Sequence, residues 1–139
     1  MNKEFILYEQ ALALKQLGFN EPCFNRFYTK PQSKIFGVDE KGRNYPIKNT
    51  SKKLYTMGEH FVLNDSNVIL APLYQQAFRW FRENYRLYST IIFRVSMEDN
   101  NEYWDWLIKG EEVVYRHFNT YEEAEDACID KLIELAKQK

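Results

Sequence analysis

The sequence predicts a single α+β domain. It is built from an N-terminal helix, short strands, a central helix, a three-stranded antiparallel meander and a C-terminal helix. Two observations carry this prediction. Three stretches repeat apolar residues at helical spacing, and the segments between them are rich in β-branched and aromatic residues. The chain has 139 residues, 45% of them hydrophobic, which suits one domain with its own core.

The first helix is expected over Lys3–Leu17. Good helix-forming residues dominate this stretch, and Leu7, Ala11 and Leu14 share one face. Gly18 stands where helices commonly end in a left-handed residue. The pattern therefore predicts an amphipathic helix that ends at Gly18.

Short strands are expected over Cys23–Thr29 and Ile35–Val38, because both runs are bounded by turn-forming dipeptides. A further strand is expected at His60–Leu63. Residues 41–55 are polar, basic and rich in turn formers. We expect this segment to be a mobile basic loop.

The central helix is expected over Leu73–Tyr85, with Pro72 in its first turn. Leu73, Ala77 and Trp80 lie on one side at helical spacing. The opposite side is polar and carries arginines. This segment therefore predicts an amphipathic helix with a cationic outer face.

Three strands are expected after it, over Ser89–Met97, Glu102–Ile108 and Glu112–Phe118. The first alternates apolar and polar residues, as a half-buried strand does. The dipeptide Lys109-Gly110 is typical of a tight turn between the second and the third strand. The three runs together predict an antiparallel meander.

The last helix is expected to begin after Thr120. Glu123 follows three residues later, which is the spacing of a capping box. An apolar stripe then continues at helical spacing through Ala124, Cys128, Leu132 and Leu135.

Charge is strongly segregated along the chain, although the formal net charge is only −1. Residues 24–55 contain eight basic and two acidic side chains, a net charge of +6. Residues 98–130 contain eleven acidic and two basic side chains, a net charge of −9. Such blocks create local potentials that steer charged partners.

The acidic block suggests a partner-binding ridge. Glu122, Asp126 and Asp130 recur every four residues on the last helix, and Glu111 and Glu112 extend the row. Such a face can engage the basic groove of a protein that handles nucleic acid. The alternative is a face that only keeps the protein in solution.

The basic residues suggest direct binding of nucleic acid instead. Lysines and arginines interleaved with aromatic rings suit a single strand, whose backbone follows the charge while bases stack on the rings. Arg79, Arg82 and Arg86 form one row on the central helix. The basic loop adds Arg43, Lys48, Lys52 and Lys53. The alternative is again a solvated surface.

Several classes of protein are disfavoured. The sequence lacks a nucleophile elbow, a Walker loop, a metalloprotease motif and a dinucleotide-binding glycine motif, so we expect no enzyme and no cofactor. His60 and His117 lie in no short-spaced pair with cysteine, which disfavours a metal site. Cys23 and Cys128 are expected to be buried free thiols in a reducing cytosol. No apolar run is long enough to span a membrane.

Three stretches carry a resemblance to a known family: ALALKQLGFNEPCF from Ala11, APLYQQAFRWFRENY from Ala71 and FNTYEEAEDACIDKLIEL from Phe118. In this order they resemble small phage- and prophage-encoded proteins of Bacteroidetes. The resemblance covers about a third of the chain and brings no established binding residues. It implies a cytoplasmic protein of a bacterial host that binds a host or phage protein. Some such phage proteins inhibit host defence, including CRISPR effectors (anti-CRISPR inhibitors).

Overall fold

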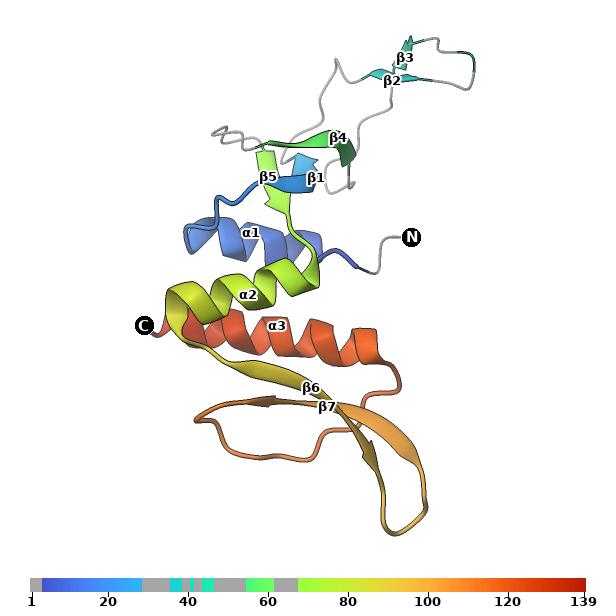
Figure 1. Ribbon diagram of the computed structural model, residues 1–139, viewed down its shortest axis with the longest axis vertical. Coiled ribbons are helices and arrows are strands. Elements are labelled where there is room, and N and C mark those ends of the chain that lie inside the picture. The colour runs from blue at the N-terminus through green and yellow to red at the C-terminus, as the bar shows by residue number, and fades with distance from the viewer. Residues whose placement is uncertain (1–3, 29–35, 39–40, 42–43, 47–54, 62–67) are drawn as a thin grey trace. The chain divides into compact units, whose positions relative to one another are not determined.

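The computed structural model describes residues 4–28, 36–38, 41, 44–46, 55–61 and 68–139, and it confirms the α+β class (Figure 1). The chain forms two compact units, one from Met1–Phe19 with Pro72–Lys139 and the other from Asn20–Ala71. The larger unit holds three helices and one hairpin: α1 (Tyr8–Gln16), α2 (Tyr74–Tyr85), β6 (Ser89–Val95), β7 (Glu102–Ile108) and α3 (Tyr121–Lys137). The smaller unit holds β1 (Cys23–Tyr28), β2 (Phe36–Val38), β3 (Asn44–Pro46), β4 (Tyr55–Phe61) and β5 (Val68–Ala71).

Helix α1 begins five residues later than predicted. Residues 4–7 are not helical, because they pair with the segment before α2. Phe5 forms an antiparallel bridge with Leu73, and the Ile6 amide donates to the Pro72 carbonyl at 3.2 Å. A long-range pairing therefore overrides the helix propensity of this stretch.

The end of α1 is as predicted. Gly18 has a φ of +100°, in the left-handed region. The Gly18 amide donates to Lys15 and the Phe19 amide donates to Leu14, at 3.1 and 2.9 Å. These two bonds form a Schellman motif, and Phe19 is buried beside Trp80.

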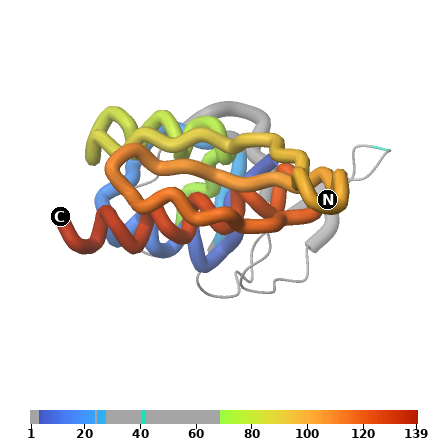
Figure 2. The backbone as a smooth tube through the Cα atoms, turned by 90° about the horizontal axis from the view of Figure 1, so that it is seen from below, coloured from blue at the N-terminus to red at the C-terminus, as the bar shows by residue number. Residues whose placement is uncertain are grey.

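Helix α3 organises the larger unit, because it packs against α1, α2, β6 and β7. The views agree that the helices cover one face of the β6–β7 hairpin (Figures 1 and 2). The Thr120 hydroxyl accepts from the Glu123 amide at 3.1 Å, as the predicted cap requires. Fully buried residues of α3 include Cys128, Ile129 and Leu132.

The predicted meander is wrong in its third strand. Strands β6 and β7 pair antiparallel in an unbroken register from Ser89 with Ile108 to Val95 with Glu102. The segment 111–118, here called the return segment, is not a strand. Only Phe118 forms a bridge, exchanging two backbone hydrogen bonds with Trp104. The turn of the β6–β7 hairpin spans residues 96–101, between the first two predicted strands. The chain also turns at Lys109-Gly110, as predicted, but no strand follows that turn.

In the smaller unit, β1 lies between β4 and β5, and β2 pairs with β3. Strand β5 was not predicted. Strand β4 begins five residues before the strand expected at His60–Leu63, whose last two residues lie outside the described ones. Residues 44–46 of the predicted loop form β3, because they pair in register with β2. Much of the predicted loop lies outside the described residues. The candidate binding residues of the loop, Arg43, Lys48, Lys52 and Lys53, lie outside them as well. Within the described part of the chain, no helix is long and apolar enough to cross a membrane.

Candidate interaction surface

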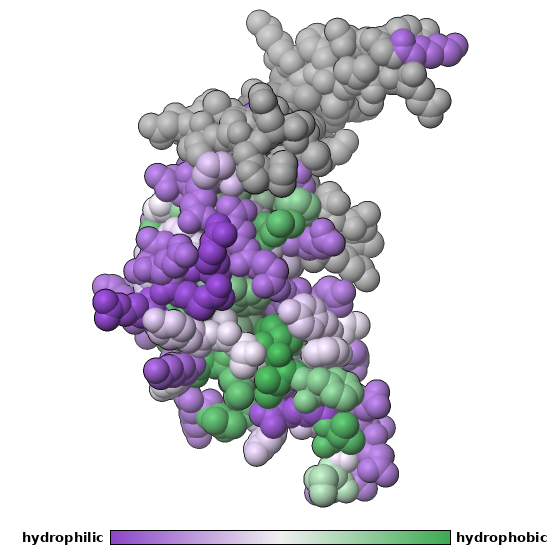
Figure 3. Space-filling view, in the orientation of Figure 1, coloured by the Kyte–Doolittle hydropathy of each residue, from purple (hydrophilic) through white to green (hydrophobic). Residues whose placement is uncertain are grey.

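The end of the β6–β7 hairpin exposes large apolar side chains. Phe93 and Val95 are 51% and 50% exposed, and Met97 in the adjoining turn is 96% exposed. Tyr115 of the return segment is 68% exposed. All four line one open groove of about 740 Å³. Figure 3 shows apolar side chains gathered over this end of the molecule. We call Phe93, Val95, Met97 and Tyr115 the hairpin surface.

Phe93 and Val95 are exposed because the hairpin extends past the helix that covers its base, whereas Tyr115 packs beside Arg94, whose side chain lies on the opposite face of the hairpin. Ile91 and Phe93 share a face with their partners Trp106 and Trp104. Trp106 is buried, whereas Trp104 is half-buried and contacts the rings of Phe93 and of Tyr121, the first residue of α3, at 5.3 and 5.2 Å between centroids. No helix among the described residues of the larger unit therefore covers the same face beyond Trp104.

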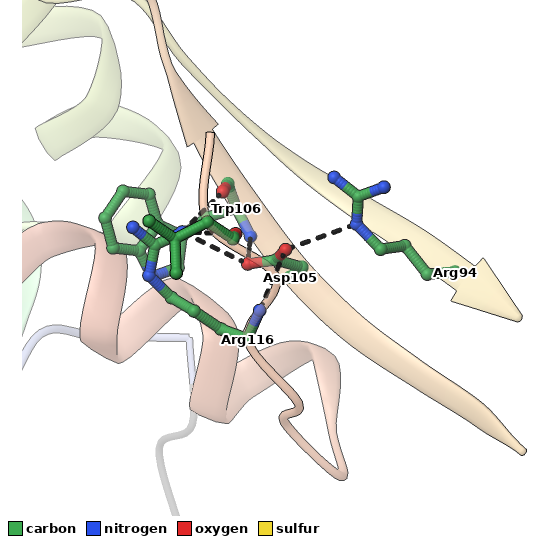
Figure 4. Close-up of polar contacts among 5 residues, drawn as sticks. Arg94, Asp105, Trp106 and Arg116 are labelled. Carbon is green, nitrogen blue, oxygen red and sulfur yellow. Dashed lines mark hydrogen bonds and ion pairs between the residues drawn. The ribbon is translucent and has the colours of Figure 1, made fainter. Parts of the chain in front are cut away.

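A buried carboxylate holds the return segment against the hairpin (Figure 4). Asp105 is fully buried and accepts from Arg94 Nε of β6 at 3.2 Å. It also accepts from the backbone amide and Nη1 of Arg116, at 3.3 and 3.5 Å. The Arg116 guanidinium lies 3.6 Å from the centroid of the Trp106 ring. These contacts join β6, β7 and the return segment next to the groove, which Arg94 also lines.

Two ring contacts continue this arrangement toward the tip of the hairpin. The Arg94 guanidinium lies 4.7 Å from the Tyr115 ring centroid. The Tyr103 and His117 rings stack at 3.8 Å. All four residues line the groove, so the hairpin and the return segment both contribute side chains that contact each other there.

Acidic residues border the hairpin surface. Glu98, Asp99 and Glu102 are exposed in or beside the turn of the hairpin. A hydrogen bond from the Asn101 amide holds the pKa of Asp99 below its usual range. The surface therefore combines an apolar centre with an anionic border, which complements a protein face of basic and apolar residues.

The five residues of the predicted acidic ridge are divided by the structure. Asp126 and Asp130 converge on the Gln10 side chain of α1, whose Nε2 donates to both carboxylates. Burial raises the pKa of Asp126, although the bond from Gln10 lowers it. Glu122 is exposed on the first turn of α3, and Glu111 and Glu112 belong to the return segment. Among the contacts of the described residues, none joins Glu111 or Glu112 to the three acidic residues of α3.

The predicted arginine row is present on α2. Arg79, Arg82 and Arg86 are all exposed, and Arg86 caps the helix with a left-handed φ of 54°. Arg82 also lines a pocket of about 180 Å³ with Ser89 and Ile91 of β6. The row is therefore exposed to solvent, and none of its members lines the groove of the hairpin surface.

A buried carboxyl group was missed by the sequence analysis. Glu125 of α3 is only 5% exposed, and burial, aided by the nearby charge of Glu122, raises its pKa to about 7. The signal was present, because Glu125 follows Tyr121 by four residues and precedes Ile129 by four. That spacing places it at the edge of the apolar stripe.

The remaining chemical groups offer no reactive site among the described residues. Burial raises the pKa of the Cys128 thiol to about 12, which makes it a poor nucleophile. No group of three or more His, Cys, Asp or Glu residues in the described ranges is arranged to hold a metal ion. No model of a known protein family matches the chain, and no curated protein or solved structure is similar to it at a significant level.

Proposed function

We propose that the protein is a non-enzymatic interaction domain that binds a partner protein through the hairpin surface. The observation that carries this proposal is the exposure of Phe93, Val95, Met97 and Tyr115 along one groove. Clustered apolar side chains of this size are costly to leave in water, and such clusters commonly mark binding sites. The Asp105 contacts favour tight binding, since a pre-organised surface loses little entropy on association.

The border of Glu98, Asp99 and Glu102 favours a partner with a basic surface. Proteins that handle nucleic acid have such surfaces, and a CRISPR effector in a phage-infected bacterium is the specific partner that the resemblance suggests. Glu111, Glu112 and Glu122 add exposed or half-exposed negative charge to the same unit. A reducing cytoplasm suits the two buried free thiols, Cys23 and Cys128.

The test compares three tagged baits in nuclease-treated lysate of the host. One is the natural sequence, one carries Met97→Ser and Tyr115→Ser, and the control carries Leu7→Ser. Leu7 is an exposed apolar residue at 55%, but it caps α1 and lies outside the groove. The control therefore makes the same kind of change elsewhere in the same unit.

We expect the natural bait and the Leu7 variant to capture the same discrete protein. The double variant should bind it at least tenfold more weakly, because truncating central apolar side chains costs about 1–2 kcal/mol each. Equal capture by all three folded baits would refute the role of the hairpin surface.

Direct nucleic-acid binding is the second candidate, and the exposed row of Arg79, Arg82 and Arg86 favours it. Each arginine that contacts a phosphate makes the slope of log affinity against log salt concentration steeper by about one. Arg82→Gln should therefore lower this slope by about one for a labelled single strand. Absence of binding at low salt would exclude this candidate.

A further inference from the structure

A pocket of about 320 Å³ lies where α3 meets the start of α2 and the segment before α1. The residues that line it include Glu4, Glu122 and Glu125 and two tyrosines, Tyr74 and Tyr121. Two backbone contacts fix this junction: the Tyr74 amide donates to the Glu4 carbonyl at 2.9 Å, and Phe5 bridges Leu73. The pocket is separate from the groove of the hairpin surface.

Glu125 is the unusual group in this pocket. It is 95% buried, yet no hydrogen bond or ion pair reaches its carboxyl group from the described residues. The neighbouring polar groups are engaged elsewhere: the Tyr74 hydroxyl donates to Asp126 at 3.4 Å, and Tyr121 interacts with Gln75. Neither Glu125 oxygen is among the described side-chain atoms that are fully buried without a hydrogen-bond partner, so the carboxyl group reaches the open space of the pocket, where a ligand can contact it.

The lining indicates the chemistry of that ligand. Carboxylates attract a cation, and the faces of tyrosine rings attract alkylammonium groups through their quadrupoles. The described carboxyl groups are not arranged to hold a metal ion, which favours an organic cation. The volume lies within the lower range of small-ligand pockets, enough for one side chain.

We propose that this pocket binds an alkylammonium group, supplied by a lysine side chain of the partner protein. The source of the group rests on the proposed function, whereas the binding chemistry does not. The ammonium lies beside Glu125, in the pocket that Tyr74 and Tyr121 also line. Basic surfaces are rich in lysine. A lysine bound in this pocket adds one specific contact to an interface whose charges are otherwise complementary in a general way.

Binding should depend on pH. The groups that face Glu125 are Glu4 from the N-terminal segment, Tyr74 from α2, and Tyr121 and Glu122 from α3, with Asp126 behind Tyr74. Burial and the Glu122 charge raise the pKa of Glu125 to about 7, and the ammonium prefers the ionised form. Affinity should therefore rise about tenfold from pH 6 to pH 8, as the ionised fraction increases.

The experiment is an amide NMR titration of the full chain with butylammonium chloride, and with 1-butanol as the uncharged control. Glu125→Gln removes the buried charge at nearly constant shape. Glu4→Gln changes an exposed lining residue without touching the core. Glu134→Gln is the matched control, because Glu134 lies on α3 outside the pocket and pairs with Lys131 at 3.0 Å.

At pH 8 we expect butylammonium, but not butanol, to shift the amides of Tyr74 and Tyr121. Glu125→Gln should weaken this binding at least fivefold and Glu4→Gln about twofold, with Glu134→Gln unchanged. No response to butylammonium, or an unaltered response in Glu125→Gln, would overturn the site. This titration needs no partner protein, so its outcome does not depend on whether the proposed function is correct. Undiminished partner capture by a Glu125→Gln bait would overturn lysine as the source.

Discussion

Replacing Glu125 by glutamine should change how the stability of the protein depends on pH. The pKa of a glutamate rises from 4.5 to about 7 at this position, because folding removes the carboxyl from water near Glu122. The folded state therefore holds the proton more tightly than the unfolded state. This contribution to stability is fully present below pH 4.5 and is lost as pH rises through 7. At 1.36 kcal/mol per pKa unit, the loss between pH 5 and pH 8 is about 2–3 kcal/mol.

The assay is urea denaturation of the natural protein and of Glu125→Gln at pH 5, 6, 7 and 8. Glutamine cannot ionise. The free energy of unfolding of the variant, relative to that of the natural protein, should therefore rise by about 2–3 kcal/mol from pH 5 to pH 8. The pKa of Asp126 is also raised by burial, but Asp126 is present in both proteins and its effect cancels. Parallel stability curves would refute the reasoning that Glu125 is desolvated in the folded state.

The remaining predictions concern residues that stabilise the larger unit. Asp105→Ala leaves two guanidinium groups and two backbone amides without their acceptor, so unfolding should become easier by about 2–4 kcal/mol and the Arg116 amide should exchange faster with solvent. A cost below about 1 kcal/mol, measured in urea, would contradict this role. Gly18→Ala meets no neighbouring atom, but its φ of +100° strains any side chain. It should therefore cost about 1 kcal/mol in the same assay, and a neutral result would show that the helix end relaxes.

Local signals in the sequence predicted the ends of helices well. The Thr120 cap and the left-handed Gly18 depend on residues within one turn, and both appear as expected. The start of α1 was misplaced because Phe5 pairs with Leu73, a contact between residues that are distant in sequence. Strand β5 was missed because its four apolar residues run directly into the proline before α2. Such a short run does not distinguish strand from helix.

The candidate site was less predictable than the fold. Alternation placed Phe93 and Val95 on one face of a strand, but only the tertiary structure shows that α3 begins too late to cover them. The acidic spacing on α3 correctly grouped Asp126 with Asp130, yet it gave no sign that Gln10 of α1 would bind both. Asp105 falls within the predicted strand Glu102–Ile108, but its burial between two arginines depends on the return segment folding back. Each of these features depends on long-range packing.

Site-specific photo-crosslinking tests the central claim most directly. A photo-reactive phenylalanine analogue is placed at Met97, and the control carries it at Gln138, an exposed position at the end of α3. After irradiation in host cells, the adducts are identified by mass spectrometry. If the hairpin surface binds a partner, position 97 should give one discrete protein adduct that position 138 does not. The same adducts from both positions, or none from position 97 in a folded protein, would contradict the claim.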